Sequence, residues 1–285
     1  MEEIVKPDEP LSQHTWMRLG GPAKYFIEPG SVEQLSEVVR RCRDNEVPVY
    51  VLGAGANLLV DDAGVNGAVV RLAGAFREVT FDASVVGAGA AAEMGKIVLR
   101  CVREGLSGLE CLTGIPGSVG GCTRMNAGGA FGDIGNAVES VEVMSDEGKV
   151  FTRQRDDLAF GYRSANIDAK FILNVSFGLN EDDPHRILKQ VKQIWIYKKN
   201  TQPLGAGSAG CIFKNPRGLS AGALIDQAGL KGRSVGDAAV SDKHANFIIA
   251  GPRAKTSDVL KLINIIQEAV YKRFEVYLEL EVEVW

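Results

Sequence analysis

The sequence predicts a protein of mixed α and β structure, built from two or three compact units. Its 285 residues are 45% apolar and 24% charged, which is enough to bury more than one hydrophobic core. The first elements read as strand, helix and strand, and a hairpin, a buried strand and further helices follow them. We therefore expect mixed structure from the start of the chain onward.

Hydrophobic spacing and capping residues predict the N-terminal elements. Residues 14–29 alternate in a strand-like manner around a Gly-Gly-Pro turn. Ser31 caps a helix, because Gln34 completes a capping box and apolar side chains recur at helical spacing as far as Cys42. The apolar run at 47–52, bounded by polar residues and glycine, predicts the next strand.

The same signals predict the later elements. Apolar residues at helical spacing after Met94 indicate a helix that Gly105 ends in a left-handed conformation. Asp183-Pro184 supplies another helix with a cap and a first-turn proline. The other expected elements are a hairpin at 138–154 that turns at 146–148, a buried strand at 170–179, helices near 219–230 and 256–274, and a terminal strand at 276–285.

Cysteine usage and charge exclude several classes. The five cysteines are an odd number, widely spaced and without a C-x-x-C pair, so we expect neither disulfides nor a metal site. Cys42 and Cys101 lie on apolar faces of predicted helices and read as small buried hydrophobes. The net charge of −4 argues against nucleic acid as the main partner. A polar, acidic N-terminal stretch and the lack of an apolar run of roughly 20 residues predict a cytoplasmic protein without membrane insertion.

The segment VLGAGANLLV, residues 51–60, follows a predicted strand and has small residues at its centre. Backbone N–H groups in such a segment can approach a phosphate oxygen, because side chains larger than methyl block the contact. A Rossmann turn is disfavoured, since Leu58 replaces the third glycine and no acidic residue stands near the ribose position. A tight glycine turn without a ligand remains the alternative.

Residues 108–135 form a second glycine-rich stretch. Each glycine costs about 0.5–1 kcal/mol relative to alanine inside regular structure. A large, flat or extended ligand lying against the backbone is the simplest reason for so many. Pro116 stiffens the turn, and Thr113, Ser118 and Asn126 offer hydrogen bonds to ring edges or phosphates.

Seven short motifs occur in order along nearly the whole chain. They are RLGGPA (18–23), VLGAGANLLV (51–60), GIPGSVGG with MNAGG (114–129), GYRSANI (161–167), SAGCIFKNP (208–216), AGALIDQAGLKG (221–232) and LELEV (278–282). In this order they resemble the UDP-N-acetylenolpyruvoylglucosamine reductases, flavoproteins of bacterial peptidoglycan synthesis. The resemblance implies an α+β protein with a vanillyl-alcohol-oxidase type FAD-binding domain of two subdomains, 1–75 and 76–187. A smaller α+β substrate domain, 188–285, would follow.

The resemblance also implies the cofactor and the substrates. FAD is expected to bind noncovalently, with NADPH as its reductant and a UDP-sugar enolpyruvyl ether as the substrate reduced to UDP-N-acetylmuramate. We expect a monomer of the shorter form of the family, which lacks an extra substrate-covering tyrosine loop. The residues expected at the cofactor are Gly53, Ala54, Gly55, Ala56, Asn57 and Leu58 in the first glycine-rich segment, and Thr113, Gly114, Pro116, Gly117, Ser118, Gly121, Cys122, Asn126 and Ala127 in the second.

Two catalytic residues are implied by their positions in the family motifs. In the family reaction, flavin N5 delivers hydride to the methylene carbon of the enolpyruvyl ether, and the adjacent carbon then receives a proton. Arg163 in GYRS supplies a planar cationic fork for the intervening enolate. Glu281 in LELEV matches a carboxylate near the developing charge. Glu279 and Glu283 share its strand face, so periodicity alone does not select among the three.

Cys211 in SAGCIFKNP stands where most family members have the serine that donates a proton to carbon. A thiol, with an unperturbed pKa of about 8.5, releases a proton more readily than an alcohol and stays largely protonated at neutral pH. Lys214 would favour the thiolate, so we expect burial or the negative charge of reduced flavin to offset it. The alternative is a core or incidental thiol.

Four residues are expected to hold the sugar nucleotide. Lys214 and Asn215 resemble the family's ligands for the diphosphate and its neighbours, and Gln227 and Lys231 are further candidates by motif position. Surface solvation is the alternative, above all for Lys231. His244 in SDKHANF either faces the substrate or is structural.

Three other classes compete with this prediction. A flavin oxidase of the same fold often tethers FAD through histidine, but no histidine lies between His14 and His185. A nonenzymatic flavin or sugar-nucleotide binder is disfavoured by the intact Arg163, Cys211 and Glu281. A flavin-free NAD(P) dehydrogenase is disfavoured by the failed Rossmann pattern, and it would be colourless.

Overall fold

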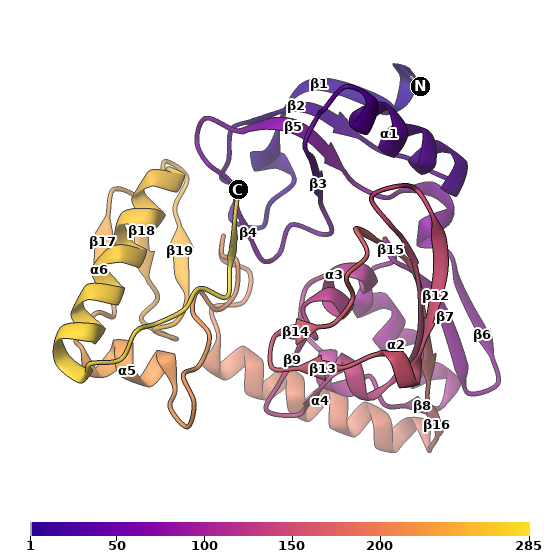
Figure 1. Cartoon of the computed structure of the whole chain (residues 1–285). Helices are drawn as coiled ribbons and strands as arrows, with labels where there is room; N and C mark the ends of the chain where they lie inside the picture. The colour runs from indigo at the N-terminus through magenta and orange to yellow at the C-terminus, as the bar shows by residue number, and fades with distance from the viewer. Residues whose placement is uncertain (1) are drawn as a thin grey trace. The chain divides into compact units, whose positions relative to one another are not determined.

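The computed structural model describes residues 2–285 and confirms the mixed class, since helices and strands occur along this whole range (Figure 1). The described residues fall into two units, each with its own hydrophobic core. Unit 1 holds residues 2–7, 25–54 and 67–198, and unit 2 holds residues 8–24, 55–66 and 199–285. The division into three domains at 75/76 and 187/188 stays a prediction.

The largest sheet of unit 1 has five antiparallel strands in the order β12-β11-β15-β7-β6. The predicted hairpin is confirmed: Met144 pairs with Val150, and Gly148 takes φ +83° in the turn. The predicted buried strand is confirmed as β15, which α3 covers. The strands are β6 (Val79–Asp82), β7 (Val85–Gly89), β11 (Val138–Met144), β12 (Val150–Gln154) and β15 (Phe171–Gly178).

The three predicted helices of unit 1, which begin at residues 32, 94 and 184, are confirmed, whereas the short helix at 119–124 was not predicted. Ser31 Oγ accepts from the Gln34 N–H (3.3 Å), so the predicted cap is confirmed. In a capping box the Gln34 side chain would accept from the Ser31 N–H. Here Gln34 Oε1 accepts from the Gly30 N–H instead (2.7 Å). Gly105 ends α2 with φ +70°. The helices are α1 (Val32–Asp44), α2 (Met94–Glu104), α3 (Val119–Arg124) and α4 (Pro184–Thr201), whose last three residues belong to unit 2.

A second sheet joins four strands in the order β1-β2-β5-β3. The strand predicted at 47–52 is shorter than expected, because only Val49–Val51 pair with the neighbouring strand. The strands are β1 (Val5–Pro10), β2 (Pro22–Ile27), β3 (Val49–Val51) and β5 (Val65–Val70). Three short pairs accompany the two sheets: β8 (Leu106–Ser107) with β16 (Asn180–Glu181), β9 (Gly128–Gly129) with β10 (Gly132–Asp133), and β13 (Phe160–Gly161) with β14 (Ser164–Ala165).

The strand prediction for 14–29 is wrong over its first half. Residues 14–17 form turns and residues 18–21 are irregular, because the Thr15 hydroxyl donates to Leu19 O (2.8 Å) and the Arg18 N–H donates to Thr15 O (3.1 Å). Such local side-chain bonds compete with strand formation. Only β2 keeps the predicted alternation.

In unit 2, helix α6 packs against the sheet β17-β18-β19 (Figure 1). The Asp62 carboxylate accepts from the backbone N–H groups of Thr256 (2.8 Å) and Ser257 (3.1 Å) at the start of α6. Both predicted helices are confirmed. The elements are α5 (Ala221–Gln227), α6 (Thr256–Phe274), β17 (Ser234–Val235), β18 (Ala238–Val240) and β19 (Ile248–Ala250). Within residues 2–285 no helix combines the length and the apolarity that a membrane span needs.

The terminal strand predicted at 276–285 is mostly wrong. Only Glu283–Val284 (β20) is a strand, and it pairs in parallel with Leu58–Leu59 (β4). Leu278 and Val282 are buried, so the alternation of this segment reflects one row of side chains packed on the core of unit 2.

Candidate active site

The two glycine-rich segments line one pocket of about 530 Å³ in unit 1. The predicted cofactor residues at its wall are Gly53, Ala54, Gly117, Ser118 and Gly121. A Cβ atom on Gly53 would lie 2.8 Å from Ser118 Oγ, and one on Gly117 would lie 2.5 Å from Cys122 Sγ. Larger residues would collide there, so the wall stays bare backbone that a ligand can approach closely.

Basic side chains dominate the charge of this pocket. Its charged residues are Arg71, Arg77, Lys96, Arg124, Lys170 and one carboxylate, Glu93. Lys96 pairs with Glu93 (2.7 Å), and Arg124 Nη2 donates to Ala169 O (2.6 Å). The excess of cations suits an anionic ligand such as a diphosphate. None of these cations was among the predicted site residues, because all but Arg124 lie outside the motifs and are scattered over residues 71–170.

Helix α3 forms one wall of the pocket. Ser118 Oγ accepts from the Gly121 N–H (3.3 Å) at its start, and the Ala127 N–H donates to Cys122 O (2.8 Å) beyond its end. Burial raises the pKa of Cys122 to about 12, so this thiol packs and does not react. Pro116 is exposed.

Thr113 carries an unusual hydroxyl group. Thr113 is buried, and its Oγ1 has no hydrogen-bond partner. Among the described side chains, Glu110 Oε1 is the other buried polar atom without a partner. Gly114 follows with φ +72°, and a Cβ there would lie 3.3 Å from Trp195 Cε3. A buried hydroxyl without a partner costs free energy, which marks this turn as a place where a ligand atom fits.

Asn126 holds the hairpin that carries Arg163. Asn126 Nδ2 donates to Gly161 O (2.8 Å) and its Oδ1 accepts from the Gly135 N–H (3.0 Å). Arg163 lies in the two-residue turn between β13 and β14 at φ +54°, with its Cζ 5.1 Å from the centre of the Tyr162 ring. A left-handed arginine is uncommon, and such strain concentrates at functional sites. The side chain of Asn126 therefore fixes backbone here, a role the sequence analysis did not foresee.

Cys211 and Glu281 lie on neighbouring segments of unit 2. The Glu281 N–H donates to Ile212 O (2.8 Å), and Phe213 forms an antiparallel bridge with Leu280. Cys211 is half-buried, whereas the other four cysteines are buried. The structure thus brings together, in one unit, two of the three predicted catalytic residues.

The three glutamates of the terminal segment differ in their surroundings. Glu279 and Glu283 are exposed, and Glu279 pairs with Lys214 (3.6 Å). Glu281 is half-buried, and Asn57 Nδ2 donates to its backbone carbonyl (2.9 Å). These surroundings distinguish Glu281 from its neighbours, which periodicity did not.

Asn246 fixes the segment that carries Cys211. Asn246 is buried; its Nδ2 donates to Phe213 O (2.8 Å), its Oδ1 accepts from the Phe213 N–H (3.0 Å), and its backbone carbonyl accepts from the Ile212 N–H (2.9 Å). The sequence analysis singled out His244 in the same motif and missed Asn246. No local pattern marks an asparagine whose partners lie 33 residues away.

Residues 55–58 of the first glycine-rich segment belong to unit 2. Gly55 takes φ +65°, and a Cβ there would lie 2.0 Å from His14 O. The Trp16 N–H donates to Gly55 O (3.0 Å). Leu58 is buried in β4 and Ala56 is half-buried. Glycine is required at 55 because two backbone segments meet there.

The predicted substrate residues line the surface around α5. Asn215 Oδ1 accepts from the Ala221 N–H (3.0 Å) at the start of the helix, and Gln227 is exposed at its end. Lys231 pairs with Asp226 (2.7 Å). Burial, followed by the charge of Lys231, lowers the pKa of His244. This favours a neutral ring, which lies edge-on to Phe247 (4.9 Å between ring centres).

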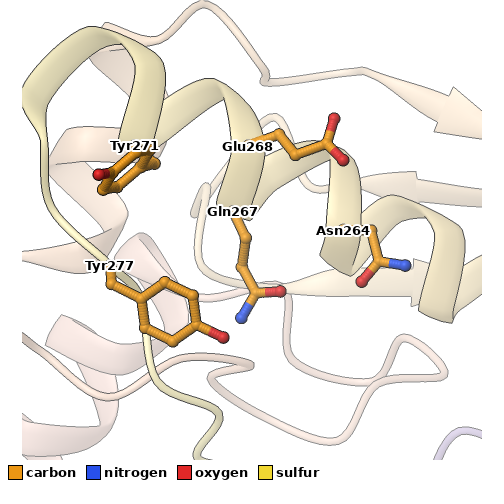
Figure 2. Close-up of a pocket in the computed structure, with 5 residues that line it drawn as sticks. All are labelled: Asn264, Gln267, Glu268, Tyr271 and Tyr277. Atoms are coloured by element: carbon orange, nitrogen blue, oxygen red, sulfur yellow. The ribbon is translucent and has the colours of Figure 1, made fainter.

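A second pocket, of about 350 Å³, lies on α6 and contains none of the predicted site residues (Figure 2). Gln267 Nε2 donates to Leu278 O (2.9 Å), and the ring of Tyr277 lies beside the Gln267 side chain in Figure 2. No cationic side chain lines this pocket. It is thus a poor place for a diphosphate.

Comparison with known families assigns both parts of the chain. Residues 23–153 match the family model described as an FAD binding domain, and residues 202–285 match the C-terminal domain of UDP-N-acetylenolpyruvoylglucosamine reductase. UDP-N-acetylenolpyruvoylglucosamine reductase 2 of Symbiobacterium thermophilum is 40% identical over 99% of this chain and 92% of its own length. The reductase of Syntrophobacter fumaroxidans is 41% identical over 97% of this chain and 82% of its own length.

Solved structures agree in fold. The UDP-N-acetylenolpyruvylglucosamine reductase of Thermus caldophilus is 41% identical, with a TM-score of 0.85 over 99% of this chain and 98% of that one. The glucose dehydrogenase Phl p 4.0202 is 16% identical, with a TM-score of 0.51 over 65% of this chain and 42% of that one. The second likeness concerns the fold alone, and together they confirm the predicted flavoprotein fold class.

Proposed function

The chain belongs to the UDP-N-acetylenolpyruvoylglucosamine reductase family and is an oxidoreductase with an FAD-binding domain; we propose that it reduces UDP-N-acetyl-3-O-(1-carboxyvinyl)-glucosamine to UDP-N-acetylmuramate with electrons from NADPH. The names of its relatives support the substrate. The residues of each unit support the chemistry.

The pocket of unit 1 fits FAD. Bare backbone at Gly53 and Gly117 permits close approach of a diphosphate, and the cationic lining offsets its charge. Outside the residues that line this pocket, the unpartnered Thr113 hydroxyl of the second glycine-rich stretch offers a further hydrogen bond. Residues 15–184 contain no histidine, which supports noncovalent binding. When bound, FAD supplies hydride transfer to the methylene carbon of the substrate.

Arg163 stabilises the charge that this transfer leaves on the carboxylate side of the substrate. Its guanidinium offers a bidentate fork to a carboxylate, which a lysine does not. The left-handed turn and the hydrogen bond from Asn126 to Gly161 O hold the backbone that carries this side chain. A preorganised cation loses little free energy to reorganisation when charge develops.

Cys211 donates the proton that completes the reaction, and Glu281 orients or replenishes it. Both residues are half-buried on paired segments, and Asn246 and Asn57 hold those segments by side-chain amides. An acid and a carboxylate carried on two paired segments suit proton transfer to carbon. We assign diphosphate binding to Lys214 and Asn215, with Gln227 and Lys231 contributing at the sugar nucleotide.

The single observation that carries this proposal is that, in a chain of this family, Cys211 is half-buried and the next residue, Ile212, accepts a backbone hydrogen bond from Glu281. The test is an absorbance spectrum of freshly purified protein, followed by NADPH and then substrate. We expect a yellow protein that NADPH bleaches and the enolpyruvyl substrate recolours. Acid precipitation is expected to release all the colour. A colourless protein, or bleaching that the substrate does not reverse, contradicts the proposal.

The role of Cys211 has its own test. Because a thiol ionises near pH 8.5, we expect stopped-flow reoxidation of the reduced flavin by substrate to slow at alkaline pH. Serine does not ionise in this range, so Cys211→Ser is expected to lose the alkaline limb. A pH profile that is the same in both proteins removes Cys211 from the role of proton donor.

A further inference from the structure

Lys198, near the end of α4, is a buried lysine that the proposed reaction does not use. It is 7% exposed, in a helix whose neighbouring lysines face solvent. Lysine is rarely buried to this extent without partners. Its ammonium group makes no ion pair among the described residues, so other contacts must justify its position.

The partners of Lys198 are backbone carbonyls of the second glycine-rich stretch. Its Nζ donates to Thr113 O (2.6 Å) and to Cys111 O (3.4 Å). The Lys198 side chain also packs against Gly114, since a Cβ on Gly114 would be 3.4 Å from Lys198 Cδ. One side chain thus contacts three residues of a single short segment, residues 111, 113 and 114.

The charge state of Lys198 agrees with this contact. Burial lowers the pKa of Lys198 to about 8, with an opposing contribution from Cys111 and a further lowering from Arg163. At pH 7 about nine-tenths of such a group is protonated. The two carbonyls therefore accept from an ammonium ion, which makes stronger hydrogen bonds than a neutral amine.

The segment that Lys198 braces presents a group without a partner. Thr113 is 8% exposed, and its hydroxyl makes no hydrogen bond in the described structure although its carbonyl is bound by Lys198. Holding the carbonyl fixes the backbone at 113 and with it the direction of the hydroxyl. A fixed, buried hydroxyl without a partner is ready to bond a ligand atom.

We propose that Lys198 is a positioning residue of the cofactor site: it holds the 111–114 turn so that the Thr113 hydroxyl meets the bound FAD. This inference rests on the proposed function, since it takes FAD as the ligand of unit 1. Lys198 acts through Thr113 and not by touching the reacting atoms. Its removal therefore weakens FAD binding, and it does so only while the Thr113 hydroxyl is present.

Titration of the apoprotein with FAD, followed by flavin fluorescence, tests the proposal. Lys198→Met keeps the methylene packing on Gly114 and removes the donors; we expect it to raise the Kd for FAD about ten- to a hundredfold, the effect of losing a charged hydrogen bond. Thr113→Val is expected to act similarly. The double variant is expected to bind no more weakly than the weaker single variant. Lys192→Met, an exposed position on the same helix, is the control and is expected to bind like the wild type.

The outcomes separate this inference from the proposed function. A Kd for Lys198→Met within about twofold of wild type overturns the inference, as does a double variant in which the two effects multiply. If circular dichroism shows that Lys198→Met does not fold, Thr113→Val decides. Near wild-type affinity for FAD in Thr113→Val then overturns the inference. A wild type that binds FAD but does not turn over substrate refutes the proposed function and leaves the inference standing. A wild type that binds no FAD refutes both.

Discussion

The pocket of unit 1 and the Cys211 segment of unit 2 are built in opposite ways. The pocket exposes backbone, because Gly53 and Gly117 leave no room for side chains at its wall. In the Cys211 segment the backbone N–H and carbonyl groups of Ile212 and Phe213 are hydrogen-bonded to Asn246 and Glu281. Side chains are therefore the groups left for contact with a ligand. The first arrangement suits binding of a large ligand, and the second suits chemistry by one or two groups.

If this contrast is correct, substitutions in the two regions separate binding from turnover. The largest effect is expected from Glu281→Gln, which removes an ionisable carboxylate and keeps its shape. We expect the reoxidation of reduced flavin by substrate to slow by about 10²- to 10⁴-fold, the usual contribution of a positioned acid or base. FAD content and reduction by NADPH are expected to be unchanged, as measured by stopped-flow absorbance. Glu283→Gln, exposed on β20, is the control, and equal slowing in both variants contradicts the assignment.

Thiol reactivity extends the same contrast to the cysteines. Burial raises the pKa of Cys101 to about 12 and that of Cys111 to about 11, so these thiols stay protonated at pH 7 and react slowly. In native protein we expect one fast equivalent of maleimide labelling, at Cys211, at least about a hundredfold faster than the rest. Mass spectrometry after timed quenching measures this. Cys211→Ser is expected to abolish the fast phase, and a second fast thiol contradicts the burial of the others.

A methyl group in the pocket wall is expected to affect binding and not chemistry. Gly53→Ala would place Cβ 2.8 Å from Ser118 Oγ, and moving that oxygen breaks its bond to the Gly121 N–H. We expect the Kd for FAD to rise about tenfold, with turnover at saturating FAD nearly unchanged. Gly95→Ala in α2 has no atom within 4 Å of the added Cβ and serves as the control. Loss of turnover at full FAD occupancy in Gly53→Ala would place this wall in the chemistry.

The smallest effect is expected at Asp62, which caps α6 and lies in neither of the two regions compared. Burial tends to raise the pKa of Asp62, but hydrogen bonds from Ser257 and Thr256 outweigh it and hold the pKa below its usual value. Because the folded-state pKa is lowered, the stabilisation is present above the unfolded pKa, near 4, and is lost as pH falls through the folded value. Asp62→Asn is expected to lower the free energy of unfolding by about 0.5–1 kcal/mol at pH 7. Denaturant unfolding at pH 7 and at a series of pH values from 4 downward measures this, and a difference between the two proteins that does not shrink as pH falls argues against the charge.

Prediction from sequence succeeded where the deciding contacts are local. The helix from Val32 depends on Ser31 and its own apolar face, and the 138–154 hairpin depends on a glycine turn. It failed at residues 14–21, where the Thr15 hydroxyl and a contact from Trp16 to Gly55 replace strand pairing. The bond from Thr15 to Leu19 is local, but apolar alternation does not reveal it. The contact from Trp16 to Gly55 joins residues too far apart for a local pattern to predict.

Motif order and glycine content were sufficient to indicate the family, the flavoprotein fold class and the candidate residues Arg163, Cys211 and Glu281, because each depends on residue identity at short spacing. Packing of distant segments supplied the rest: the cationic lining of the pocket, the amide clamps of Asn126 and Asn246, the greater burial of Glu281 than of Glu279 and Glu283, and the brace from Lys198 to Thr113. The physical reason is that charge and hydrogen-bond partners act through space. Residues such as Lys198 and Thr113, 85 positions apart, acquire a shared role when folding brings them within 3 Å.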